Sequence, residues 1–123
     1  MSAKVAFIGL GVMGFPMAGH LKAKGYDVTV YNRTASKAED WVKKHGGRSA
    51  PTAADAAKDQ DFVMLMVGND NDVEQVALGA DGALSTMKKG AILIDHTTAS
   101  ADIARRVFAA AREKGVDFID APV

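Results

Sequence analysis

Short, continuously apolar runs alternate with amphipathic stretches along this chain, and the alternation limits the folds that the chain can adopt. The apolar runs cover residues 5–8, 28–31, 62–67, 91–95 and 116–119. Strands of a parallel sheet have this character, because helices cover both faces of the sheet and leave neither face to water. We therefore predict buried parallel strands at these runs, and a further brief strand around residues 48–49.

The stretches between the apolar runs have the spacing of helices, at residues 15–24, 36–45, 51–58, 71–78, 82–88 and 100–114. Pro16 falls in the first turn of the first helix, where its missing N–H costs little, and Gly25 ends that helix. Strand–helix–strand units wind right-handed and place both strands in one parallel sheet. The pattern predicts an α/β fold, a Rossmann doubly wound parallel sheet that forms a single domain over residues 1–123.

Composition excludes several classes of function. Lys and Arg together number 15, as do Asp and Glu, so no net charge attracts nucleic acid or an anionic membrane. The chain has no cysteine, which excludes disulfides and thiolate metal sites and fits a reducing compartment. Its apolar runs are too short to span a bilayer, and its start lacks the layout of a signal peptide. A cytoplasmic protein without nucleic-acid or membrane partners is expected.

A glycine-rich loop follows the first predicted strand and opens the first predicted helix. The pattern G-x-G-x-x-G is matched by Gly9-Leu10-Gly11-Val12-Met13-Gly14. In a dinucleotide site, Gly9 would permit the tight turn, Gly11 the approach of the backbone to a pyrophosphate, and Gly14 close packing of helix on strand. The helix N-terminus would offer unpaired N–H groups to the diphosphate. The alternative is a purely structural turn without a ligand. The position of the motif, between the first strand and the first helix, makes this alternative the less favoured one.

The end of the second predicted strand carries cations where a carboxylate is usual in NAD-binding units. There, Asp or Glu accepts hydrogen bonds from the ribose 2′-hydroxyl, whereas this chain has Asn32, Arg33 and Thr34, with Lys37 one turn later. Arg33 can pair bidentately with a 2′-phosphate, which a carboxylate would repel. We predict NADP as the cofactor, with NAD less favoured. The alternative is that Arg33 and Lys37 are ordinary solvated charges.

These residues resemble the N-terminal signature of the β-hydroxyacid dehydrogenases, a family that includes 3-hydroxyisobutyrate dehydrogenase, tartronate semialdehyde reductase and the glyoxylate/succinic semialdehyde reductases. The resemblance is carried by residues 7–21, by Asn32-Arg33-Thr34 with Lys37, by Asp95-His96-Thr97-Thr98, and by residues 118–123. It extends from end to end of this chain and covers less than half of a family member. It implies an NADP-binding Rossmann domain without the family's all-helical C-terminal domain.

The resemblance also implies which positions hold the cofactor. Met66, Val67 and Asn71 would line the cofactor pocket, although Val67 replaces a commoner Pro. Val73 would lie near the adenine, and Thr98 with Thr97 would approach the nicotinamide. The complete implied set is Gly9, Leu10, Gly11, Val12, Met13, Gly14, Asn32, Arg33, Thr34, Lys37, Met66, Val67, Asn71, Val73, Thr97 and Thr98.

The catalytic groups of the family have no counterpart within this chain. In the family, a Ser-Gly-Gly segment holds the substrate carboxylate and a helix-borne Lys acts as general acid; both would lie beyond Val123. His20, His45 and His96 lack metal-ligand spacing, and no metal is expected. His96 follows the fifth strand, near the expected nicotinamide, and we interpret it as a cofactor neighbour or a solvated loop residue rather than a proton donor.

Two classes of function remain open at this point. In the first, the chain is the cofactor domain of an NADP-dependent oxidoreductase that interconverts a small β-hydroxy acid and its semialdehyde, or of an imine reductase. Alone it would bind cofactor without turnover. In the second, it is a stand-alone, non-catalytic nucleotide-binding or interaction module. Because an open sheet edge and bare apolar surface favour association, self-association of the chain is also expected.

Overall fold

The computed structural model describes residues 3–122. The predicted domain 1–123 and the family-like stretch 118–123 therefore extend slightly outside the described residues, at Met1, Ser2 and Val123. The strands are β1 (Lys4–Ile8), β2 (Asp27–Tyr31), β3 (Arg48–Ser49), β4 (Phe62–Leu65), β5 (Ile92–Asp95) and β6 (Asp117–Asp120). The helical segments are α1 (Gly14–Ala23), α2 (Ala35–His45), α3 (Ala53–Ala57), α4 (Asp70–Val73), η1 (Glu74–Leu78), η2 (Ala83–Ser85) and α5 (Ala101–Glu113).

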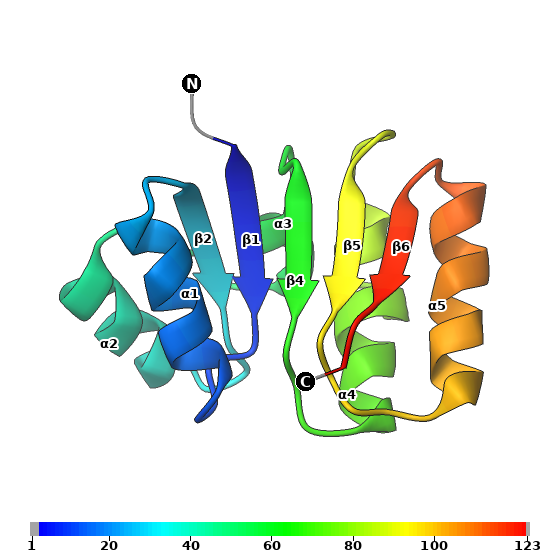
Figure 1. The fold of residues 1–123 in the computed structure, drawn as a ribbon, viewed down its shortest axis with the longest axis horizontal. Helices are drawn as coiled ribbons and strands as arrows, with labels where there is room; N and C mark the ends of the chain where they lie inside the picture. The colour runs from blue at the N-terminus through cyan, green and yellow to red at the C-terminus, as the bar shows by residue number, and fades with distance from the viewer. Residues whose placement is uncertain (1–2, 123) are drawn as a thin grey trace.

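All the strand pairs are parallel, and the 6-stranded sheet has the order β3-β2-β1-β4-β5-β6. Figure 1 shows β2, β1, β4, β5 and β6 side by side in this order. The chain therefore reverses direction across the sheet between β1 and β4, the switch point at which doubly wound folds bind ligands. The predicted fold class, including the brief strand at residues 48–49, is confirmed.

The two faces of the sheet carry separate apolar cores. On one face, Phe7, Val28 and Val30 pack with Ala18 of α1 and Trp41 of α2. The other face holds the larger core, in which residues of α3, η1 and α5 cover the alternate positions of β1, β4 and β5. Two-sided covering explains why the strands are continuously apolar in sequence. In the part of the chain that the structure describes, no helix is long and apolar enough to cross a membrane.

Three segments differ from the sequence prediction. The strand expected over 62–67 ends at Leu65, because the N–H of Val67 donates to the side chain of Thr97 instead of a neighbouring strand. The helix expected over 71–78 consists of a short α-helix, α4, that continues into the π-helical segment η1. In η1, Gly79 N–H donates to the Glu74 carbonyl oxygen five residues earlier. The helix expected over 82–88 is only the 3-10 turn η2.

Candidate functional site

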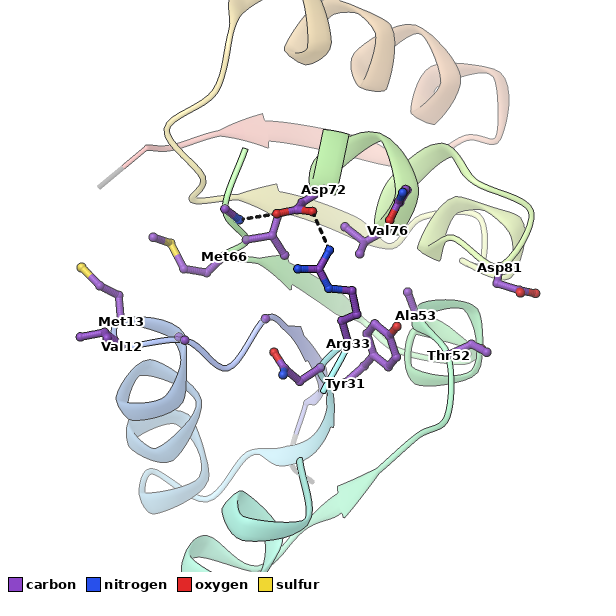
Figure 2. A pocket seen from close by; sticks show the side chains of 17 residues that line it. Val12, Met13, Tyr31, Arg33, Thr52, Ala53, Met66, Asp72, Val76 and Asp81 are labelled. Carbon is purple, nitrogen blue, oxygen red and sulfur yellow. Dashed lines mark hydrogen bonds and ion pairs between the residues drawn. The ribbon is translucent and has the colours of Figure 1, made fainter. Parts of the chain in front are cut away.

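A cavity of about 580 Å³ lies at the carboxyl ends of the strands, over the switch point (Figure 2). Loops after β1, β2, β3 and β4 contribute to it because the carboxyl ends of parallel strands meet at one edge of a sheet. Its volume falls within the range of roughly 300–1,000 Å³ typical of small-molecule sites. It is lined by Gly9, Gly11, Val12, Met13, Gly14, Tyr31, Asn32, Arg33, Thr52, Ala53, Met66, Val67, Gly68, Asp72, Gln75, Val76 and Asp81.

Gly9 and Gly14 are required by packing within the protein. Gly9 has φ +104°, in the region that favours glycine, and a Cβ there would lie 2.0 Å from the Met66 carbonyl oxygen. A Cβ on Gly14 would lie 2.0 Å from the Gly9 carbonyl oxygen. These glycines therefore allow β1, β4 and the start of α1 to meet closely, as the sequence argument predicted for the turn and the helix.

Gly11 differs from its two neighbours in the motif. A Cβ placed there would meet nothing within 4 Å, so packing does not require glycine at this position. The following N–H groups, of Val12, Met13 and Gly14, have no acceptor within residues 3–122. They lead into α1, whose N-terminus carries a partial positive charge. The loop thus presents bare backbone donors to the cavity, as an anion such as a diphosphate requires.

Asn32 fixes the glycine loop to the end of β2. Its Oδ1 accepts a hydrogen bond of 2.9 Å from Leu10 N–H, and its Nδ2 donates to the Thr34 carbonyl oxygen at 3.2 Å. The loop is also held by Gly9 N–H, which donates to the Tyr31 carbonyl oxygen at 2.9 Å. Asn32 lines the cavity, and its amide oxygen positions the loop.

The cationic end of the site lies beside β2. Arg33 extends from the end of β2 toward α4, and its Nη1 lies 3.2 Å from Asp72 Oδ1 (Figure 2). The Arg33 side chain is 78% exposed, so it is free to reorient. Thr34 and Lys37 are exposed at the start of α2 and do not line the cavity. Among the predicted cationic residues, Arg33 is the one that the structure brings into the cavity wall.

The buried residues Asp95 and Thr97 support the cavity wall that the loop after β4 forms. The N–H of Val67 donates to Thr97 Oγ1 at 3.0 Å, and the N–H of Thr97 donates to Asp95 Oδ1 at 2.9 Å. Asp95 is 2% exposed, and burial raises the pKa of its carboxyl, although hydrogen bonds from Thr97 oppose the rise. Thr97 thus lies behind Val67 and holds the β4 loop in place.

Several predicted cofactor residues do not line the cavity. Leu10 and Val73 are buried, one in each of the two apolar cores. Asn71 is exposed and borders a separate surface groove with Glu74 and Arg106. The remaining predicted residues outside the cavity lining are Thr34, Lys37, Thr97 and Thr98.

Other lining residues were missed by the sequence argument. Asp72 of α4 and Val76 of η1 lie four residues apart and both line the cavity, whereas Val73 and Ala77 are buried. That spacing was the available signal, because residues i and i+4 share a helix face. Thr52 caps α3, accepting from Asp55 N–H at 3.0 Å, and sits after β3 at the same sheet edge. The remaining missed residues are Tyr31, Ala53, Gly68, Gln75 and Asp81.

The histidines have structural surroundings. His45 packs between Phe15 and Trp41, with ring centroids 5.8 and 5.3 Å away. His96 Nδ1 lies 2.9 Å from the carbonyl oxygen of Ala121. Within the described range 3–122, no group of three or more His, Cys, Asp or Glu could hold a metal ion.

Comparison with known proteins accounts for this arrangement. Residues 4–123 match the family described as the NAD binding domain of 6-phosphogluconate dehydrogenase. The chain belongs to this family. It is therefore a nicotinamide-dinucleotide-binding domain, and the predicted resemblance is confirmed.

Relatives extend well beyond the matched region. The chain is 60% identical over 121 residues to an uncharacterized oxidoreductase of Shewanella frigidimarina, covering 98% of this chain and 42% of the relative. It is 41% identical over 120 residues to a probable 3-hydroxyisobutyrate dehydrogenase-like protein of Arabidopsis thaliana, covering 98% and 40%. The chain thus spans less than half the length of these relatives.

Solved structures agree with the fold. A 3-hydroxyisobutyrate dehydrogenase of Mycobacterium tuberculosis, solved with L-serine, superposes with TM-score 0.88 at 31% identity, over 100% of this chain and 41% of the other. An imine reductase of Myxococcus stipitatus with NADP⁺ gives TM-score 0.82 at 30% identity, over 95% and 39%. A variant of that enzyme with NAD⁺ gives 0.85 at 27%, over 98% and 40%.

Proposed function

We propose that this domain binds NADP and serves a dehydrogenase of the 3-hydroxyisobutyrate type. The observation that carries the proposal is the joining of two features in one cavity: the bare backbone donors around Gly11, and Arg33 at the end of β2. The first suits a diphosphate and the second suits a 2′-phosphate.

The residues present fit such a cofactor. The N–H groups of Val12, Met13 and Gly14 would hold the diphosphate, because they lack partners within residues 3–122 and Gly11 leaves room above them. Arg33 would bind the adenosine end, and Met66 and Val67 would form the apolar wall on the β4 side. Once bound, the nicotinamide supplies or accepts a hydride. Asn32 and Thr97 would hold the two loops in shape.

NADP is favoured over NAD by the charges at the end of β2. Residues 32–37 contain no carboxylate, and Arg33 and Lys37 are both exposed there. An acidic residue at this place would accept hydrogen bonds from the ribose hydroxyls of NAD and would repel a 2′-phosphate. Since an imine reductase neighbour has been solved with NADP⁺ and a variant of it with NAD⁺, the fold accommodates both cofactors.

The proposed reaction of the full-length enzyme is hydride transfer between a small β-hydroxy acid and its semialdehyde. The chain by itself would bind cofactor without turnover, because residues 1–123 provide no counterpart of the family's Lys or Ser-Gly-Gly segment. Hydride transfer to a carbonyl needs a group that stabilises the developing charge on its oxygen. The single-domain boundary 1–123 and a cytoplasmic location of the protein remain predictions.

Calorimetric titration of the chain with NADPH and then NADH tests the cofactor proposal. NADPH is expected to bind more tightly, and the difference should shrink at higher salt because the charges at Arg33 are exposed. Equal affinities would remove the NADP preference and leave the dinucleotide site. Absence of binding by either cofactor would contradict the proposed function.

A second candidate is the cofactor domain of an imine reductase, which the structural similarity to the Myxococcus enzyme favours. Assaying the product of the complete reading frame with hydroxy acids and with cyclic imines separates the two. Turnover of imines alone would replace the hydroxy-acid proposal. A stand-alone binding module would bind the dinucleotide, and its complete frame would turn over neither class.

Self-association also stays a prediction. The edge strand β6 carries Ile119, which is 49% exposed, and the neighbouring α5 carries Phe108, also 49% exposed. Exposed apolar side chains beside an open sheet edge favour association. Sedimentation at increasing concentration should show oligomers, and a monomer throughout would contradict the prediction.

A further inference from the structure

Arg33 is already paired with a carboxylate of the cavity wall. Its Nη1 lies 3.2 Å from Oδ1 of Asp72, which reaches across from α4 (Figure 2). Both side chains line the cavity. A 2′-phosphate that binds Arg33 therefore either displaces Asp72 from the ion pair or lies close to the negative charge of Asp72.

Asp72 is the fixed member of this pair. Its Oδ2 accepts from Gly68 N–H at 3.2 Å, and its own N–H donates to Asn69 Oδ1 at 3.0 Å. A Cβ on Gly68 would lie 2.7 Å from Asp72 Oδ2, so the loop and the carboxylate are in close contact. The Asp72 side chain is 22% exposed, against 78% for Arg33. Arg33 can leave, whereas Asp72 remains in the wall with its negative charge.

We propose that Asp72 is a specificity-determining residue that limits the preference of this site for NADP. It does so by pairing with Arg33 in the free protein and by repelling a 2′-phosphate in the complex. NAD carries no phosphate at this position, so its binding leaves the pair intact. This inference rests on the proposed function, since it needs Arg33 to meet the 2′-phosphate.

The size of the effect follows from the exposure of the pair. Exposed ion pairs contribute little, on the order of a two- to fivefold change in an equilibrium constant. Removing the Asp72 charge should therefore tighten NADPH binding about two- to fivefold. Binding of NADH should change less than about twofold, because the pair does not need to open.

The test is calorimetric titration of the unsubstituted chain and of Asp72→Asn and Asp72→Ala with NADPH and NADH. Asn keeps an oxygen that can accept from Gly68 N–H, while Ala adds no donor that could itself bind phosphate. Asp81→Asn is the matched control, since Asp81 is a carboxylate of the same cavity without an ion pair to Arg33. Both Asp72 variants should have a higher ratio of NADPH affinity to NADH affinity than the unsubstituted chain. Asp81→Asn should change this affinity ratio less.

A double-mutant cycle with Arg33→Ala separates this role from a structural one. In the Arg33→Ala background, the gain from Asp72→Asn should fall, because the pair no longer exists. NADPH binding that is unchanged or weaker in both Asp72 variants, or tightened equally by Asp81→Asn, would overturn the inference and leave the proposed function standing. Absence of NADPH and NADH binding by the unsubstituted chain would overturn both.

Discussion

The two ends of the candidate site are built in opposite ways. At the glycine loop, Gly9 and Gly14 are fixed by contacts of the backbone with itself, and Asn32 ties the loop to β2. At the other end, Arg33 is exposed and held by one ion pair. The comparison indicates that the site's rigid part would recognise what all nicotinamide dinucleotides share. Its adjustable part would distinguish between them.

The largest effect is expected from Gly9→Ala. A Cβ there would lie 2.0 Å from the Met66 carbonyl oxygen, at φ +104°. Backbone strain and overpacking together should lower the free energy of unfolding by roughly 3 kcal/mol or more. Urea unfolding followed by circular dichroism measures this. Stability equal to that of the unsubstituted chain would contradict the packing role of the loop.

Gly11→Ala is the matched variant inside the same motif. Because a Cβ there meets nothing within 4 Å, the free energy of unfolding should change by less than about 0.5 kcal/mol. Affinity for both NADPH and NADH should fall roughly ten- to a hundredfold, since displaced diphosphate loses charge-assisted hydrogen bonds. Calorimetry and urea unfolding on one sample check both. Unchanged affinity would mean that the loop does not approach a ligand.

Arg33→Ala tests the adjustable end. NADPH affinity should fall about five- to twentyfold at low salt, NADH affinity should change less than about twofold, and stability should be almost unaffected. Lys43→Ala, an exposed cation in the last turn of α2, controls for the loss of one positive charge. Equal losses for both cofactors would place Arg33 outside the 2′-phosphate site.

The smallest effect is expected from the buried wall behind Val67. Burial raises the pKa of Asp95 above its ordinary 3.8, so the folded chain binds more protons than the unfolded chain just above that pH. The Asp95 contribution to stability is therefore lost as pH rises from about 4 through the folded pKa. The free energy of unfolding of Asp95→Asn should therefore rise relative to that of the unsubstituted chain as the pH increases through this range. A constant difference across urea titrations from acid to neutral pH would contradict the raised pKa.

The same contrast explains how much the sequence could predict. The apolar strands and the glycine loop follow from local patterns, and they were predicted with small errors at their ends. The stretch 82–88 was predicted as a helix and forms only a short turn, because Gly82 packs against the backbone of Ala77 and Gly79. Such close backbone contacts between successive turns leave no periodic signal in the sequence.

The site was predicted less completely than the fold. Gly9, Gly11, Gly14 and Arg33, which were predicted to bind the cofactor, all line the cavity. Asp72 was not predicted, since its role depends on the approach of α4 to the end of β2, across a sequence separation of 39 residues. Val73 was expected near the adenine and lies in the core, because the helix turns its neighbours Asp72 and Val76 toward the cavity.

Amide NMR of the isotope-labelled chain during titration with NADPH tests the proposed cofactor site most directly. The largest shift changes are expected at Gly11, Val12 and Met13, and a second group of changes is expected at Arg33 and Asp72. With NADH, the glycine-loop changes should persist and those at Arg33 should shrink. Changes confined to the surface around Phe108 and Ile119, or no change at Gly11 at saturating NADPH, would contradict it.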